Sequence, residues 1–244
     1  MANLERIAYL AAKDGVVPVD KPSGVPFQEV VQTVKRRFNL AKVGHGGSLE
    51  AAASGVFLVL LGDASRVTQH LMCADREYEA ELRLGIETDT ADTQGRVLRT
   101  AAVEAELVDV DRIRAVLDSE FRGDVFESKP RFSAILRNGS TSYEIVETDA
   151  KSAPRLVHYY RIAVVSWEPP VLKLSMKCGK DASPRAFAGA LGKCLGCGAV
   201  LCSLRRTSFG RFSADCCLQY EKLLTMNAMD FAERVIPVPE AVGR

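Results

Sequence analysis

Residues 43–56 read VGHGGSLEAAASGV, and no other part of the chain says more about its architecture. They place an imidazole, His45, and a carboxylate, Glu50, five residues apart in a glycine-rich loop that leads into the apolar run Val56–Leu61. Glycine lets the backbone approach a ligand closely, and a buried strand holds such a loop in place. From these residues alone, a ligand-binding loop and a tight turn with an exposed glutamate are both open.

The composition is that of a globular protein with an ample core. The chain has 244 residues, of which 47% are hydrophobic and 26% charged, a size that suits one large domain or two small ones. Val56–Leu61 is the longest apolar run and is far too short to span a membrane. Without a recognisable signal peptide, we expect a cytoplasmic protein with no membrane partner, and organellar import remains the open alternative.

Charge and cysteine content bear on partners. The net charge of +1 does not itself favour nucleic acid, but basic residues cluster at 35–37, 129–137, 177–185 and 205–206. Each cluster alone could be a solvated face, and their recurrence favours a phosphate-binding surface. Cys194 and Cys197 have zinc-knuckle spacing but lack a second pair. We therefore expect reduced thiols and no metal.

The pattern of apolar residues predicts an irregular mixture of strands and helices, and hence an α+β fold with a central mixed or antiparallel sheet. Asp63 is expected to cap a short helix that carries Val67 and Leu71. The predicted strands are Val16–Val19, Val56–Leu61, Glu77–Leu84, Ile162–Trp167 and Leu172–Met176, and the predicted helices are Phe27–Phe38, Asp109–Phe121 and Arg185–Leu195.

Five segments resemble, in order, motifs of the TruB-type pseudouridine synthases. The family pattern for residues 43–56 is approximately GHxGxLDPxASGVL, with aspartate at the position of Glu50 and proline at the position of Ala51. The other four are DKPSG at 20–24, Tyr78 with LGIETDTADTQG at 84–95, PRFSA at 130–134, and LRRTSFGRF at 204–212. Together they extend over about 190 residues, so the resemblance implies a pseudouridine synthase fold with an RNA-binding cleft.

The resemblance also implies an activity and a substrate. Members of the family isomerise a uridine in the T-arm of transfer RNA to pseudouridine, through a flipped base and without metal or redox cofactor, so we expect no cofactor. Glu50 matches the essential carboxylate and Tyr78 the tyrosine that stacks on the target base. Arg185 matches the arginine that pairs with the carboxylate, a task for a forked guanidinium. An ion pair between Glu50 and Arg185 is therefore expected.

Further residues of the predicted site would hold the RNA. Leu204 matches an apolar residue that lines the pocket, and His45 matches the residue associated with displacing the flipped nucleotide. A basic cleft is expected as well, formed by Lys21, Arg131, Lys180, Arg185 and Arg206. Residues 1–244 are expected to form a single catalytic domain without a C-terminal accessory domain of the PUA type, so that RNA binding should be strongly dependent on salt.

Departures from the family pattern leave more than one function open. Glu50 is one methylene longer than aspartate, and DASPR at 181–185 stands where the family has GTYIR. The first interpretation is an RNA uridine isomerase on the pseudouridine synthase fold that works slowly, or on a changed substrate, with Glu50. The second is a non-catalytic protein on the same fold that binds or folds RNA or assembles a ribonucleoprotein with a protein partner. The third is a metabolic enzyme with an unrelated carboxylate site.

Overall fold

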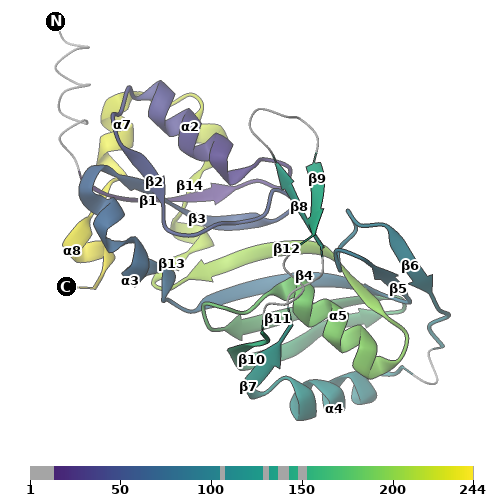
Figure 1. Ribbon diagram of the computed structural model, residues 1–244. Helices are drawn as coiled ribbons and strands as arrows, with labels where there is room; N and C mark the ends of the chain where they lie inside the picture. Colours follow the sequence, from purple (N-terminus) through teal and green to yellow (C-terminus); the bar gives the residue numbers. More distant parts are fainter. Residues whose placement is uncertain (1–13, 105–107, 129–131, 137–142, 148–152, 244) are drawn as a thin grey trace, which may run out of the picture. The chain divides into compact units, whose positions relative to one another are not determined.

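The structure is a computed structural model that describes residues 14–104, 108–128, 132–136, 143–147 and 153–243 (Figure 1). The chain divides into two compact units. Unit 1 comprises Met1–Arg76 and Arg205–Arg244, and unit 2 comprises Glu77–Leu204, inserted between the two parts of unit 1. The expectation that residues 1–244 form a single domain without an accessory domain stays a prediction.

Unit 1 is built on strands that flank β3. Strand β1 pairs antiparallel with β3, and the last residues of β12 (Ala199–Phe209) pair parallel with the start of β3. The other pairs are β2 with β3, and β1 with β14 and β15. The elements of unit 1 are β1 (Gly15–Lys21), α2 (Phe27–Arg37), β2 (Val43–His45), β3 (Ser54–Leu61), η1 (Gly62–Val67), α3 (Thr68–Met72), β13 (Phe212–Ser213), η2 (Ala214–Cys216), β14 (Leu218–Gln219), α6 (Tyr220–Leu223), α7 (Ala228–Glu233), β15 (Ile236–Pro237) and α8 (Val238–Ala241).

The core of unit 1 explains why β3 is a continuous apolar run. All residues of β3 after Ser54 are buried, as expected for a strand that is covered on both faces. One side of the strand contributes Val56, Leu58 and Leu60 to a cluster with Phe209 and Phe212. The predicted strand at Val56–Leu61 is confirmed, and it gives the preceding loop a rigid end.

The start of the segment after β3 differs from the prediction. The chain turns into the 3-10 helix η1, whose N-cap is Leu61, and no side chain caps it. Gly62 has a φ of 55° and tightens the turn. The backbone N–H of Asp63 donates to the carboxylate of Asp14 (2.7 Å), so Asp14 satisfies the amide of the residue that was expected to be the cap.

Unit 2 contains a sheet in the order β12–β4–β11–β10–β7. Strands β10 and β11 pair antiparallel, as do β10 and β7. Two hairpins, β5–β6 and β8–β9, form separate small sheets. The elements of unit 2 are β4 (Arg76–Leu84, which starts on the last residue of unit 1), β5 (Ile86–Thr88), β6 (Val97–Thr100), α4 (Val110–Glu120), β7 (Gly123–Glu127), β8 (Phe132–Leu136), β9 (Tyr143–Glu147), β10 (Arg155–Glu168), β11 (Val171–Cys178) and α5 (Pro184–Leu195).

Helices α4 and α5 pack on each other and α4 packs on β10. The ring centroid of Phe121 lies 4.9 Å from that of Phe187 on α5, and Phe187 lies 5.7 Å from Tyr159 of β10. The predicted strand at Glu77–Leu84 is confirmed as β4, in which Tyr78, Ala80 and other apolar side chains are buried and the acidic ones more exposed. Its buried face therefore belongs to the core of unit 2.

The helix boundaries follow local sequence signals. The Ser183 hydroxyl accepts a hydrogen bond from the Ala186 N–H at the start of α5, and Pro184 occupies the first turn. Gly196 ends the helix with a φ of 82°. The α+β class with a mixed sheet and flanking helices is confirmed. None of the helices that the structure describes is long and apolar enough to cross a membrane.

Candidate active site

The Glu50 segment, residues 48–56, is held in unit 1 mainly through its backbone. Glu50 itself is exposed, and its carbonyl accepts a hydrogen bond from the Ala53 N–H (3.1 Å). The Ala51 carbonyl accepts from the Gly24 N–H (2.7 Å) and the Ala52 carbonyl from the Ser23 hydroxyl (2.7 Å). The turn after β1 thus fixes the residues that follow Glu50.

Lys21 binds the same segment from inside unit 1. Its side chain is fully buried, and its ammonium donates to the carbonyl oxygens of Pro22 (2.9 Å), Val25 (2.8 Å), Ala51 (3.2 Å) and Ala53. A buried cation that is surrounded by carbonyl oxygens is a structural tie. The predicted place of Lys21 on a basic surface does not agree with this burial.

Arg206 holds the two ends of the Glu50 segment. Its Nε donates to the Val56 carbonyl (2.7 Å) and one terminal nitrogen donates to the Ser48 carbonyl (3.1 Å). The guanidinium lies over the ring of Phe209, 4.8 Å from the centroid. Only 2% of Arg206 is exposed, so this side chain, like Lys21, does not lie on the surface predicted for it.

Two buried cations so close together affect each other. Burial, and secondarily the positive charge of Arg206, lower the pKa of Lys21 from 10.5 to about 8. Between them, on β3, Gly55 pairs with Lys21 on one side and Arg206 on the other. Gly55 has a φ of 104°, and a Cβ there would lie 2.1 Å from the Arg206 carbonyl oxygen. Glycine is therefore required at this position.

His45 is held as a neutral ring at the end of β2. Burial lowers its pKa below the ordinary value of 6.5, and the Gly47 N–H donates to Nδ1 (3.3 Å). The proton of the neutral ring is then on Nε2. The ring packs against Phe27 with a centroid distance of 4.8 Å. The predicted role of His45 in displacing a nucleotide stays a prediction.

Unit 2 contributes Tyr78 and Leu204 from neighbouring strands, β4 and β12. Both side chains are at least nine-tenths buried. Tyr78 also acts electrostatically on Tyr159, whose pKa is raised by burial first and then chiefly by Glu127. The pocket role predicted for Tyr78 and Leu204 remains a prediction.

Glu127 and Tyr159 form a buried pair that the sequence did not suggest. The Tyr159 hydroxyl donates to one Glu127 oxygen, and the Ser183 N–H donates to the other (2.9 Å). Burial raises the pKa of Glu127. Because Ser183 is the N-cap of α5, this pair ties β7 and β10 to the end of the helix that carries Arg185.

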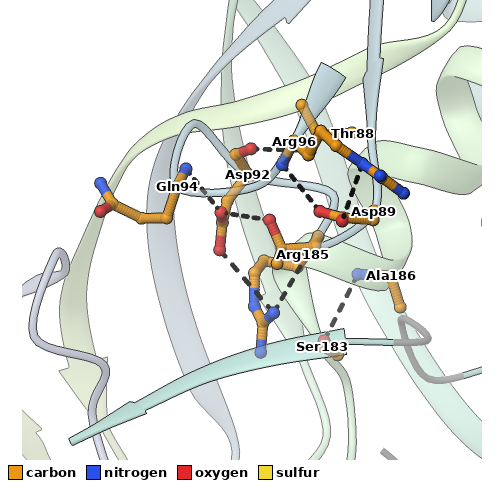
Figure 2. A network of polar contacts seen from close by, with 9 residues as sticks. Thr88, Asp89, Asp92, Gln94, Arg96, Ser183, Arg185 and Ala186 are labelled. Atoms are coloured by element: carbon orange, nitrogen blue, oxygen red, sulfur yellow. Dashed lines mark hydrogen bonds and ion pairs between the residues drawn. The ribbon is translucent and has the colours of Figure 1, made fainter. Parts of the chain in front are cut away.

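Arg185 lies in the first turn of α5 and is bound by a turn of unit 2 (Figure 2). One terminal nitrogen donates to the Thr90 carbonyl (3.1 Å) and lies 3.7 Å from Oδ2 of Asp92. Both members of this ion pair have side chains that are less than 15% exposed. The structure therefore gives Arg185 a carboxylate partner within its own unit, in addition to the partner predicted at Glu50.

The turn that holds Arg185 is fixed by its own side chains (Figure 2). Oδ1 of Asp92 accepts from the Thr90 hydroxyl (2.6 Å) and the Gln94 N–H (2.8 Å), while the Asp92 carbonyl accepts from the Thr88 hydroxyl (2.7 Å). Asp92 is thus a site residue that we did not single out. The signal was present, since it lies inside the matched motif at 84–95.

The remaining predicted cations are only partly placed. Lys180 is exposed, as is its neighbour Asp181. Arg131 lies outside the described residues. Unit 1 thus brings together Lys21, Arg206 and the Glu50 segment. Unit 2 carries Tyr78 and Leu204 on neighbouring strands and Arg185 in the first turn of α5. The predicted ion pair between Glu50 and Arg185 would join the two units, and it stays a prediction, as does the basic cleft.

Comparison with known proteins gives a consistent result. The model of the "TruB family pseudouridylate synthase (N terminal domain)" matches residues 35–183. The "tRNA pseudouridine synthase B" of Aromatoleum aromaticum is 36% identical over 232 residues, which cover 94% of this chain and 74% of that protein. The protein of the same name from Francisella philomiragia is 35% identical over 212 residues, 86% of this chain and 70% of that protein.

Solved structures share the fold. The archaeal box H/ACA sRNP Nop10–Cbf5 complex matches with a TM-score of 0.69 and 26% identity over 96% of this chain. An H/ACA RNP bound to a substrate RNA containing 2'-deoxyuridine matches with a TM-score of 0.70 at 24% identity. This chain spans 63% and 62% of the length of the two matched chains. The pseudouridine synthase fold expected from the sequence is confirmed.

Proposed function

The chain belongs to the TruB family of pseudouridylate synthases, and from this premise we propose that it isomerises a uridine of transfer RNA to pseudouridine. The observation that carries the proposal is the similarity to proteins named tRNA pseudouridine synthase B, at 34–36% identity over most of both chains. We further propose the T-arm as the substrate region, on the strength of the five ordered motifs. No observation favours a non-catalytic RNA-binding role.

The reaction requires a carboxylate, a pocket for a flipped base and a proton acceptor. The bond between C1' and N1 of the uridine breaks, the uracil turns over, and a bond forms between C1' and C5. The proton leaves C5 and N1 gains one, so no oxidant or reductant is needed. We assign Glu50 as the carboxylate that acts beside the ribose and the uracil ring. Tyr78 is assigned to stacking on the base, and Arg185 to orienting the Glu50 carboxylate.

The contacts of unit 1 support a working role for glutamate at position 50. The backbone on both sides of Glu50 is tied through the carbonyls of Ser48, Ala51 and Ala53. The side chain therefore extends from a fixed origin, and its length sets where the carboxylate lies. A protein that had adapted to glutamate would need this fixed origin, because a misplacement of about 1 Å can lower a rate about a hundredfold.

The contacts of unit 2 support the role of Arg185. A guanidinium that is anchored to Asp92 and Thr90 is already oriented before the substrate binds, and such preorganisation contributes to catalysis because no further ordering is needed. Because Arg185 is bound in this way, we assign the binding of RNA phosphates to exposed cations such as Lys180. Binding to phosphates through such cations should weaken steeply with salt.

The test is tritium release from C5-labelled uridine in a T-arm stem-loop transcript. The parent protein should release tritium, and Glu50→Ala should release none while binding the RNA as the parent does, since Glu50 adds no attraction to a polyanion. Binding should fall between low and physiological salt. Equal release by the parent and Glu50→Ala would remove Glu50 from the chemistry. If the parent protein binds the RNA but releases no tritium, the non-catalytic RNA-binding role is the correct one.

A further inference from the structure

Arg206 is placed to control the geometry of the Glu50 segment. Its side chain donates both to Ser48, before Glu50, and to Val56, at the end of the segment. A planar guanidinium presents its donors at fixed angles, so two bonds from one fork set the distance between the two carbonyls. Lys21 and Ser23 bind carbonyls in between. Arg206 thus binds both ends of the Glu50 segment, and Lys21 and Ser23 bind its middle.

Arg206 has no access to substrate. With 2% of the residue exposed, its guanidinium cannot reach a phosphate or a base without a change of fold. Its Nε and one terminal nitrogen donate to main-chain carbonyls, and the face of the guanidinium lies against Phe209. These contacts connect Arg206 to the reaction through the backbone of the segment.

Resting on the function proposed above, we propose that Arg206 is a positioning residue for pseudouridine formation. It fixes the two ends of the Glu50 segment and thereby the place of the Glu50 carboxylate relative to the uridine. Replacing an arginine with a purely structural role would lower only the stability of the protein. Replacing a positioning residue would also lower the turnover of the molecules that remain folded.

Arg76 provides a matched comparison within unit 1. It is also buried, with 7% exposed, and its guanidinium lies 4.6 Å from the centroid of the same Phe209 ring. It also donates to two main-chain carbonyls, those of Met72 and Ala74. These carbonyls lie beyond the Glu50 segment. Replacing Arg76 therefore removes a similar packing and hydrogen-bonding arrangement without releasing Ser48 or Val56.

The proposal has a second consequence, at alkaline pH. Protonated Lys21 supports the segment through Ala51 and Ala53, so turnover should fall as the pH rises through its pKa of about 8. Of the charged groups near Lys21, Arg206 on β12 lowers that pKa, Asp20 on β1 is bound by Arg205 (2.8 Å), and Glu50 belongs to the segment. Replacing Arg206 with a neutral residue should therefore move this alkaline fall in turnover to higher pH.

The experiment compares Arg206→Met, Arg206→Lys and Arg76→Met with the parent, each corrected for its folded fraction by circular dichroism. Arg206→Met should lower kcat for the T-arm stem-loop about a hundredfold, the effect of a misplacement of about 1 Å, with KM within about threefold. Arg206→Lys keeps the positive charge but not the forked guanidinium. Its kcat should therefore lie between those of Arg206→Met and the parent, and its turnover should fall at the same alkaline pH as the parent's. Arg76→Met should melt earlier, with kcat within about threefold of the parent's.

Hydrogen–deuterium exchange of the Gly24 and Ala53 amides, both bonded to segment carbonyls, gives a readout independent of activity. Exchange there should accelerate in Arg206→Met and not in Arg76→Met. If the parent has no turnover, the proposed function fails, and exchange alone decides the role of Arg206. If Arg206→Met does not fold, Arg206→Lys decides through its kcat. Unchanged kcat in the folded Arg206 variants, a change in KM alone, or an equal loss of kcat in Arg76→Met would overturn the proposal.

Discussion

The two units secure their reactive groups in opposite ways. In unit 1, buried cations bind main-chain carbonyls on either side of Glu50, whose own side chain is exposed. In unit 2, the Arg185 side chain itself is bound, by the Thr90 carbonyl and the Asp92 carboxylate, and is largely buried. Unit 1 thus fixes the backbone from which the Glu50 side chain extends, whereas unit 2 fixes the charged end of the Arg185 side chain.

This difference has a consequence for substitutions. Where contacts hold the backbone, as on both sides of Glu50, a side chain of another length can be accommodated without a steric clash, but its charged end moves by the full change in length. Where the charged end is fixed, a neutral substitution leaves a partly buried partner without its counter-charge, which costs stability as well as function. Stability and activity should therefore separate at Glu50 and change together at Arg185 and Asp92.

The largest effect is expected from Gly55→Ala, which strikes the backbone of unit 1. The new Cβ would lie 2.1 Å from the Arg206 carbonyl, at a φ of 104°. We expect the free energy of unfolding in urea to fall by about 3 kcal/mol, from strain and overpacking together, and turnover to be lost. Gly24→Ala is the control, because its φ is 87° but nothing lies within 4 Å of the new Cβ. Equal losses in both would mean that the close approach at Gly55 is unimportant.

Asp92→Ala should affect stability and activity together. It removes the acceptor of the Thr90 hydroxyl and the Gln94 N–H and the counter-charge of Arg185. Loss of a buried hydrogen-bonding partner of this kind lowers the free energy of unfolding by about 2 kcal/mol, and a mobile Arg185 should lower kcat about a hundredfold. Asp89→Ala, in the same turn but paired with Arg96, should leave kcat within about threefold. A stable, fully active Asp92→Ala would refute the anchoring of Arg185.

Glu50→Asp should lower activity with little effect on stability. The fixed backbone cannot follow a shorter side chain, so the carboxylate withdraws by about 1 Å and kcat falls about ten- to a hundredfold. Because Glu50 is exposed, thermal unfolding should not change measurably. A rise in kcat would show instead that glutamate is a defect in this chain and that aspartate repairs it.

The smallest effect is expected from Glu127, in the dependence of stability on pH. Burial raises the pKa of Glu127 above 4.5, so its contribution to stability is fully present below 4.5 and is lost as the pH rises through the folded-state pKa. The free energy of unfolding of the parent, relative to Glu127→Gln, should therefore fall as the pH rises above 4.5. Tyr159→Phe removes a hydrogen bond that lowers this pKa, so the fall should extend to higher pH. A constant difference would refute the burial argument.

Elements with a local signal were predicted well from the sequence. The predicted strand Glu77–Leu84 and the predicted helix Arg185–Leu195 are both found, as β4 and α5, because their signals lie in neighbouring residues. The surface predicted for Lys21 and Arg206 was not found, because a cationic side chain normally indicates exposure, and only the tertiary structure shows carbonyls that converge on it. Glu127 and Tyr159 are 32 residues apart, and no local pattern connects them. Asp92 lay in a recognised motif, but its partner in space was not evident from spacing.

The central claim is that Glu50 and Arg185 serve one reaction, and a double-mutant cycle on single-turnover rates tests it most directly. Glu50→Gln and Arg185→Met would be measured alone and together on the T-arm stem-loop. If both residues act on one uridine, the double variant should be no slower than the slower single variant, as for residues that work as a unit. Losses that multiply, or a Glu50→Gln variant that turns over like the parent, would contradict the account.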